Sequence, residues 1–102
     1  MTMMISRHWH GLAKAEHADG YVRHLRKETF PLLEKIPGFV DASILRRSVD
    51  EGVDFLIVSR WASLDAIRQF SGQDAELAVV PANVQRMMLS YDDRVRHYEV
   101  VE

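Results

Sequence analysis

Apolar and polar residues alternate along the chain in segments whose periods predict a strand and then a long helix. Residues 3–11 interleave bulky and polar side chains up to a glycine, which is typical of a strand. Over residues 14–35 the apolar positions recur at steps of three and four, which predicts a helix. Pro31 should kink or break this helix near Lys27, because proline cannot donate to the carbonyl four residues earlier. The pair Pro37-Gly38 then ends it.

The middle of the chain predicts a hairpin followed by a short helix. Residues 39–47 and 53–61 are two mainly apolar runs, joined across residues 48–52, and Gly52 supplies the permissive backbone that such a turn needs. Ser63 is then a candidate N-cap for a helix that ends at Gly72.

The last third predicts one more helix and a final strand. Pro81 can open a helix, and residues 94–101 form the strand. The helix carries an apolar stripe made of Val84, Met87, Met88 and Tyr91. The order βαββαβ over residues 1–102 predicts a single α+β domain of the ferredoxin-like kind, a four-stranded antiparallel sheet with its helices on one face.

The two hairpin strands have apolar side chains on both faces. Phe55 and Ile57 alternate with Leu56 and Val58, and residues 39–47 repeat the pattern. Helices can cover only one of these faces, so the other must pack against something else. The most economical solution is an identical sheet around a two-fold axis, which predicts a homodimer. The alternative is that a C-terminal segment or a second short helix folds over that face.

Composition and charge exclude several classes of protein. The chain has 102 residues and a formal net charge of −2, so neither nucleic acid nor an anionic membrane is an expected partner. It has no cysteine, which excludes disulfides, thiolate zinc sites and cysteine nucleophiles and fits a reducing cytosol. Residues 1–12 hold Arg7, His8 and His10 and lack a long apolar run, so they predict neither a signal peptide nor a membrane span. The expected location is therefore the cytoplasm.

Short motifs along the chain resemble those of the antibiotic-biosynthesis-monooxygenase-like domains. They are Met4-Ile5-Ser6-Arg7-His8-Trp9-His10-Gly11, Pro37-Gly38-Phe39, Leu45-Arg46-Arg47, Ser59-Arg60-Trp61-Ala62-Ser63 with Ala66-Ile67, and His97-Tyr98-Glu99-Val100. The resemblance implies a dimeric α+β barrel, in which two ferredoxin-like sheets face each other. It implies no single function, because this superfamily includes cofactor-independent oxygenases, haem-degrading enzymes, isomerases, dehydratases and proteins without a known activity.

The resemblance also implies a type of chemistry. Members that oxidise anthrone- or quinol-like compounds use no metal and no flavin, because the deprotonated substrate itself reduces oxygen. Such a site needs an apolar pocket, a proton acceptor and donors aimed at the developing oxyanion. A tryptophan at the end of the third strand lines the pocket in several members, and Trp61 matches that position.

The chain departs from part of the family. Many relatives have a histidine in the following helix, where this chain has Phe70. The haem-degrading branch needs a histidine ligand somewhat further on, yet no histidine occurs between His24 and His97. The resemblance therefore does not extend to haem degradation.

Three histidines fall on strands that should be neighbours. His8 and His10 are two residues apart and share a face, and His97 belongs to the last strand. A metal site from all three is geometrically allowed, but no carboxylate has a telling spacing, so we predict no bound metal and solvent-facing or hydrogen-bonded histidines. His8 is the better candidate for a general base or a hydrogen-bond donor.

Two other residues have a structural and a functional interpretation. Arg7 lies among apolar neighbours, where it either forms an ion pair, for instance with Glu99, or binds a carboxylate or oxyanion in the pocket. Trp61 either fills the core or forms the pocket wall.

The leading hypothesis is a cofactor-independent monooxygenase that acts on a small aromatic or quinol-type compound with O2. Its candidate catalytic residues are His8, Trp61, Arg7 and His97. The alternatives are a non-catalytic or stress-response module that holds a small hydrophobic ligand in the same cavity, and a purely structural dimer with a filled core.

Overall fold

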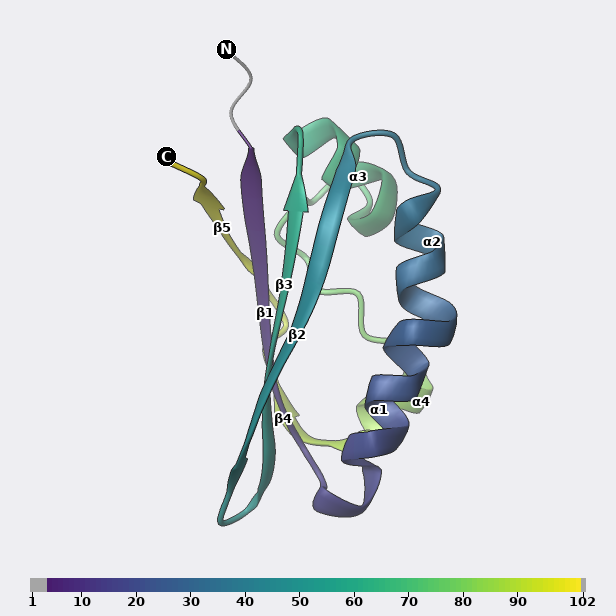
Figure 1. Cartoon of the computed structure of the whole chain (residues 1–102), viewed down its shortest axis with the longest axis vertical. Helices are drawn as coiled ribbons and strands as arrows, with labels where there is room; N and C mark the ends of the chain where they lie inside the picture. The colour runs from purple at the N-terminus through teal and green to yellow at the C-terminus, as the bar shows by residue number, and fades with distance from the viewer. Residues whose placement is uncertain (1–3, 102) are drawn as a thin grey trace.

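The computed structural model describes residues 4–101 as an antiparallel sheet with its helices packed on one face (Figure 1). The strand order is β2-β3-β1-β4, with β1 at Ile5–Ala13, β2 at Phe39–Val49 and β3 at Gly52–Trp61. The prediction of an α+β fold with helices on one face of an antiparallel sheet is confirmed. Residue 3, which opens the first predicted strand, lies outside the described residues.

The fourth strand position is shared by two short strands, so the sheet of the described chain has five strands. Strand β4 (Met88–Tyr91) pairs with Gly11–Ala13 of β1, and β5 (Arg96–Glu99) pairs with Ile5–His8. The predicted helix through Tyr91 is wrong beyond Met87, because α4 spans Ala82–Met87 and Met88 is already extended. A short apolar run fits a helix or a strand equally well, and here pairing with β1 decides between them.

The first helix follows the predicted path with an irregular middle. A 3-10 turn at Ala15–His17 leads into α1 (Ala18–His24), a π-helical turn at Leu25–Thr29 and α2 (Phe30–Glu34). Because Pro31 lacks an N–H, the α-helical hydrogen bond to Lys27 cannot form, and the π turn spans this region. The expected irregularity near Lys27 is confirmed.

The β2–β3 hairpin is tighter than predicted. Val49 pairs with Gly52, which leaves only Asp50 and Glu51 in the turn. Gly52 is required for a different reason from the predicted one, since a Cβ atom there would overlap the carbonyl oxygen of Ala13. The glycine therefore permits the close approach of β1 rather than the turn itself.

Helix α3 (Leu64–Ser71) begins and ends where the sequence predicts. The Ser63 hydroxyl accepts a hydrogen bond of 3.1 Å from the Ala66 N–H, and Gly72 follows the helix with φ +87°. Residues 73–80, which we call the strap, then cross the same side of the sheet before α4. The helices and the strap thus enclose one face of the sheet (Figure 1).

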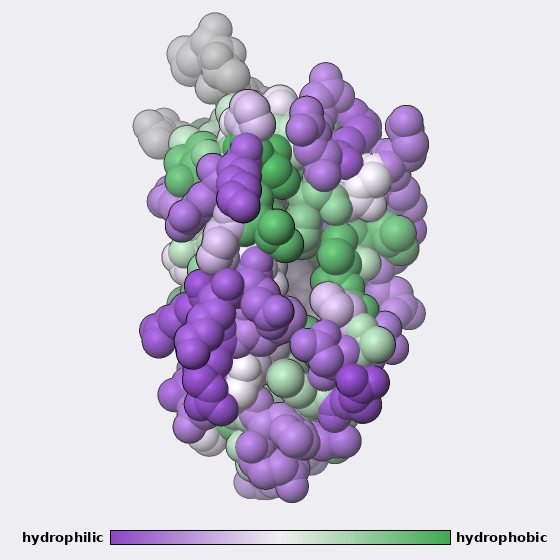
Figure 2. All heavy atoms as spheres, turned by 90° about the vertical axis from the view of Figure 1, so that its right-hand side faces the viewer, coloured by the Kyte–Doolittle hydropathy of each residue, from purple (hydrophilic) through white to green (hydrophobic). Residues whose placement is uncertain are grey.

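The two faces of the sheet carry different residues. On the helix side, Trp9, Tyr21 and Phe55 belong to one buried cluster, and Trp61 and Ile67 belong to a second. Viewed from this side, hydrophilic side chains cover most of the surface and apolar ones gather toward its middle (Figure 2).

The opposite face, which we call the open face, bears an apolar patch. Leu45 and Tyr98 are each 49% exposed, and Leu56 and Val58 are half-buried. The C-terminal strand β5 lies within the sheet, so the alternative in which a C-terminal segment folds over this face is wrong for the described residues. Among residues 4–101 no helix covers it either (Figure 1).

Replacing Gly38 tests the turn that leads into β2. Gly38 has φ +97°, and an added Cβ would lie 2.7 Å from the Ala66 Cβ. Gly38→Ala should therefore lower the free energy of unfolding by about 1–3 kcal/mol. The matched control is Gly20→Ala in α1, where the nearest atom is 3.7 Å away and a gain of about 0.5–1 kcal/mol is expected. Urea unfolding of both variants measures this, and equal effects would contradict the assignment.

Candidate functional site

A small cavity lies between the sheet and the helices, beside Arg7. Its volume is about 60 Å³. Most of its wall is aromatic or aliphatic, and the polar groups are an arginine, a serine, a threonine and a tyrosine. The lining residues are Arg7, Trp9, Tyr21, Leu25, Thr29, Phe30, Leu33, Ile57, Ser59, Phe70 and Val79. We call it the Arg7 cavity.

Arg7 is buried, with 6% of its surface exposed, and it has an unusual set of contacts. Its Nη2 donates a 2.8 Å hydrogen bond to the Leu77 carbonyl of the strap, and its guanidinium lies 5.4 Å from the centre of the Phe70 ring. Its Nε has no hydrogen-bond partner. Burial lowers the pKa of Arg7 to about 10, so the group still carries its charge at neutral pH.

The expected ion pair between Arg7 and Glu99 does not form. Glu99 is exposed and lies opposite Ile5 in the strand register, whereas Arg7 lies opposite His97. No carboxylate of residues 4–101 forms an ion pair with Arg7. The structural interpretation of Arg7 is therefore wrong in its partner.

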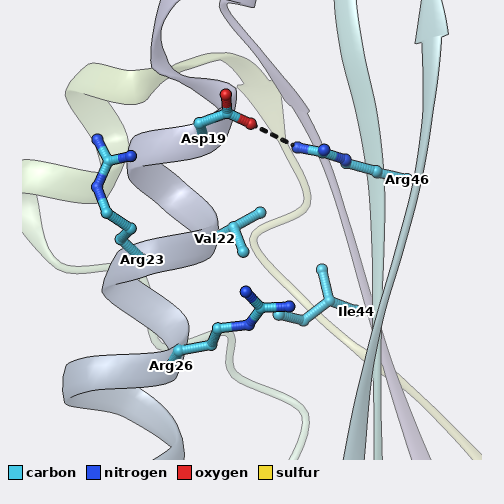
Figure 3. Close-up of a pocket in the computed structure, with 6 residues that line it drawn as sticks. All are labelled: Asp19, Val22, Arg23, Arg26, Ile44 and Arg46. Atoms are coloured by element: carbon cyan, nitrogen blue, oxygen red, sulfur yellow. Dashed lines mark hydrogen bonds and ion pairs between the residues drawn. The ribbon is translucent and has the colours of Figure 1, made fainter.

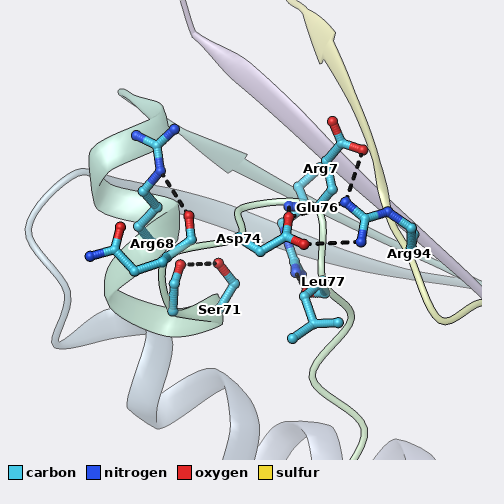
Figure 4. A network of polar contacts seen from close by, with 9 residues as sticks. Arg7, Arg68, Ser71, Asp74, Glu76, Leu77 and Arg94 are labelled. Atoms are coloured by element: carbon cyan, nitrogen blue, oxygen red, sulfur yellow. Dashed lines mark hydrogen bonds and ion pairs between the residues drawn. The ribbon is translucent and has the colours of Figure 1, made fainter.

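The carboxylates of the strap pair with another arginine (Figure 4). Arg94 contacts Asp74 at 3.0 Å and Glu76 at 3.4 Å. The backbone N–H of Val95 also donates to the Glu76 carbonyl at 2.8 Å, so the strap is tied to the start of β5. This arrangement holds the strap over Arg7 and leaves both acids engaged elsewhere.

His97 lies beside Arg7 on the helix side of the sheet. Its Nε2 is buried and has no hydrogen-bond partner. Burial and the nearby charge of Arg7 lower the pKa of His97, and Glu76 opposes this in part. The imidazole is therefore neutral at neutral pH and can accept a proton.

Trp61 is fully buried behind the cavity wall. Its Nε1 donates a 2.9 Å hydrogen bond to the Ser59 Oγ, and its ring contacts Phe39 at 5.1 Å and Phe70 at 6.4 Å between centres. Ser59 and Phe70 line the cavity, and Trp61 does not. Trp61 thus supports two lining residues from behind.

His8 lies on the other face of the sheet from Arg7. Its Nε2 is 2.8 Å from the Ser6 Oγ, and its ring centre is 4.9 Å from that of Tyr98. Burial lowers the pKa of His8. The structure therefore brings Arg7, His97 and Trp61 to the helix side but separates His8 from them.

The histidines that could have shared a metal are likewise divided between the faces. His10, on the open face with His8, contacts the Asp54 carboxylate through its Nε2, whereas His97 lies on the helix side. Within residues 4–101 no group of three or more metal-ligating side chains is placed to hold an ion.

Ser59 and Phe70 are the site residues that sequence reasoning missed. Ser59 is two positions before Trp61 on a strand, so alternation alone places the two side chains on one face. Phe70 was noted only as the replacement of a histidine, yet its ring contacts both Arg7 and Trp61.

A larger hollow is the groove between α1 and β2 (Figure 3). Its volume is about 350 Å³, and its walls include Arg23, Arg26 and Arg46, all exposed to solvent. Arg46 is paired with Asp19 at 2.9 Å. Water screens these charges, so the groove offers weaker electrostatic binding than a buried cation.

The fold is a ferredoxin-like α+β arrangement with a small cavity between the sheet and the helices. The sequence matches the antibiotic biosynthesis monooxygenase (ABM) family over residues 4–82, and the chain belongs to this family. No curated protein matches the sequence.

No helix in the described part of the chain is long and apolar enough to cross a membrane.

Solved structures share the fold at low sequence identity. A candidate antibiotic biosynthesis monooxygenase from Caulobacter crescentus has a TM-score of 0.73 and 19% identity, covering 99% of this chain and 92% of that one. SnoaB, a cofactor-independent oxygenase from Streptomyces nogalater, has a TM-score of 0.58 and 16% identity, covering 100% and 94%. The haem-degrading protein Rv3592 from Mycobacterium tuberculosis has a TM-score of 0.61 and 17% identity, covering 100% and 96%. At these identities the likeness shows the fold alone.

The histidine environments predict how stability depends on pH. Folding lowers the pKa of both His8 and His97 below the ordinary value of 6.5, so near this pH the unfolded chain binds more protons than the folded one. The free energy of unfolding should therefore rise as the pH rises from about 5 to 7. Urea unfolding across this range checks this, and the His97→Gln variant should show a smaller rise. A stability that falls over the range would contradict the described burial of these rings.

Proposed function

We propose that the chain is a cofactor-independent monooxygenase that oxidises a small aromatic or quinol-type compound with O2 in the Arg7 cavity. Membership of the ABM family supports this proposal, as does the shared fold of SnoaB, a cofactor-independent oxygenase. The observation that carries it is the buried, charged Arg7 beside the neutral His97 at an aromatic cavity.

The proposed reaction begins with loss of a proton from the substrate. His97 accepts this proton through a bridging water, because it lies beside Arg7 rather than in the cavity wall. The Arg7 guanidinium stabilises the resulting anion, whose charge develops in surroundings of low dielectric constant. The anion then reduces O2, so that one oxygen atom enters the product at the oxidised carbon. The other leaves as water, which takes both of its hydrogens from the substrate, one of them by way of His97.

Trp61 and His8 have different parts in this proposal. Trp61 holds Ser59 and Phe70 in place and so shapes the wall that the substrate meets. His8 belongs to the open face, where we propose that two copies of the chain pack together. We also propose the cytoplasm as the location, which the absence of cysteine favours.

A binding module without catalysis is the second candidate, because the buried polar groups of the Arg7 cavity can hold a ligand without reacting with it, and the size of the cavity restricts how large that ligand is. A volume of about 60 Å³ is well below the roughly 300–1,000 Å³ of typical ligand sites. The same observation disfavours haem degradation, since haem would not enter such a cavity without a large rearrangement. A module of this kind would show tryptophan quenching by small aromatic ligands but no consumption of oxygen.

Oxygen uptake tests the catalytic proposal. With one-ring hydroquinones as substrates and a chelator present, uptake should exceed the autoxidation background. Arg7→Met should lower the rate roughly 100-fold by removing the anion stabiliser, and His97→Gln should also alter the pH profile. Trp61→Phe should lower the rate because it removes the hydrogen bond to Ser59.

The control for these variants is His17→Gln, whose side chain is exposed on the 3-10 turn, and it should keep the wild-type rate. Circular dichroism confirms that each variant is folded. Uptake that is equal in Arg7→Met and the wild type would contradict the proposed site.

Light scattering tests the proposed homodimer. Leu45→Asp places a charge on the open face and should convert a dimer into a monomer, because charge is disfavoured at the core of an interface. The matched control is Leu32→Asp on α2, where the leucine is 58% exposed on the helix side, and it should leave the mass unchanged. A wild-type mass of one chain, 11.8 kDa, would contradict the homodimer.

A further inference from the structure

Arg7 differs from the arginines of the described chain that form ion pairs. These arginines are exposed and have acidic partners; they are Arg46, Arg47, Arg60, Arg68 and Arg94. Arg7 is buried, carries its charge at neutral pH and has no carboxylate partner within residues 4–101. A buried charge without a counter-charge is costly, so a protein that keeps one has usually provided for a partner.

The acids nearest to this region cannot serve as that partner. Asp74 and Glu76 of the strap are both engaged by Arg94, at 3.0 Å and 3.4 Å. The strap offers Arg7 only a backbone carbonyl, that of Leu77, at 2.8 Å (Figure 4). The described residues therefore provide no carboxylate that pairs with Arg7, and a bound anion would supply the missing counter-charge.

A second hydrogen-bond donor lies next to Arg7, on the neighbouring strand and on the same face of the sheet. Ser59 is paired with Arg7 in the β1–β3 register, is 6% exposed and lines the same cavity. Its Oγ already accepts a hydrogen bond from Trp61 Nε1 at 2.9 Å. The Ser59 hydroxyl hydrogen consequently remains to be donated, and no acceptor for it occurs among the residues that the structure describes.

Arg7 and Ser59 thus make one wall of the cavity a set of donors for an anion. The rest of the wall includes Trp9, Tyr21 and Phe30, whose rings suit an aromatic ligand. A cavity of about 150 Å³ is known to hold one benzene ring. At about 60 Å³ this cavity therefore limits the ligand to a single ring, and its wall must move to admit even that.

We propose that the Arg7 cavity binds a one-ring aromatic anion, whose carboxylate or phenolate oxygen accepts hydrogen bonds from Arg7 and from the Ser59 hydroxyl. The ligand supplies the negative charge that no carboxylate of the described residues provides to Arg7. This inference rests on the proposed ligand site, and it holds whether or not the bound compound is oxidised.

Benzoate and benzamide form a matched pair that tests the charge requirement. The two molecules have nearly the same shape, but only benzoate is charged at pH 7.5. Calorimetry and tryptophan fluorescence without oxygen should show that benzoate binds about tenfold or more tightly than benzamide, because a charged pair in a buried site is stronger than a neutral one. Equal binding of the two, or tighter binding of benzamide, would overturn the proposal.

Variants of both donors assign the anion to this cavity. Ser59→Ala should weaken benzoate binding with little effect on benzamide, and Arg7→Met should abolish the preference between the two. The control is Arg26→Met in the exposed groove between α1 and β2, which should keep the preference (Figure 3). If Arg7→Met fails to fold, the relative affinities of the wild type and of Ser59→Ala for benzoate and benzamide still test the proposal. A preference that persists in Arg7→Met, or that is lost in Arg26→Met, would overturn the assignment.

Two further arms define the ligand class. 4-Nitrophenolate at a pH above its pKa tests the phenolate form, and 1-naphthoate, with two rings, should bind more weakly than benzoate. Tighter binding of 1-naphthoate would overturn the one-ring limit. Benzoate binding without oxygen uptake by any substrate would refute the proposed oxygenase alone, whereas uptake with neutral substrates and no preference for anions would refute this inference alone.

Discussion

Antiparallel pairing of β1 with β3 determines which side of the sheet each candidate residue occupies. In this register Arg7 lies opposite Ser59 and faces the helices, while His8 lies opposite Val58 and faces away from them. A shift of this register by one residue would move every side chain of the strand to the opposite face of the sheet. Neither the cavity nor the apolar patch of the open face would then form. The cavity with its donors and the apolar open face are therefore two consequences of one strand pairing.

Most of the fold could be predicted because local patterns decide it. The cap at Ser63, the helix end at Gly72 and the irregular helix before Pro31 each follow from the chemistry of one residue. The split of the last strand position into β4 and β5 could not be predicted, since the apolar run at Met87 and Met88 suits a helix as well as a strand.

The candidate site was harder to predict, because it depends on contacts between distant segments. Arg7 is a candidate from the sequence alone, but its contact with Leu77 joins residues seventy positions apart, and no local pattern indicates it. Grouping His8 with Arg7 was an error that alternation could have prevented, since neighbouring residues of a strand point to opposite faces. The same alternation would have added Ser59 to the face of Trp61.

The central feature of the site is the Arg7 guanidinium, which is buried between the sheet and the helices and has no carboxylate partner among the described residues. A crystal structure of the protein grown with benzoate tests whether an anion binds to Arg7 and Ser59. The carboxylate should lie within hydrogen-bond distance of the Arg7 guanidinium and the Ser59 hydroxyl, with the ring among Trp9, Tyr21 and Phe30. Benzoate bound in the exposed arginine groove instead, with the Arg7 cavity unchanged, would contradict this prediction.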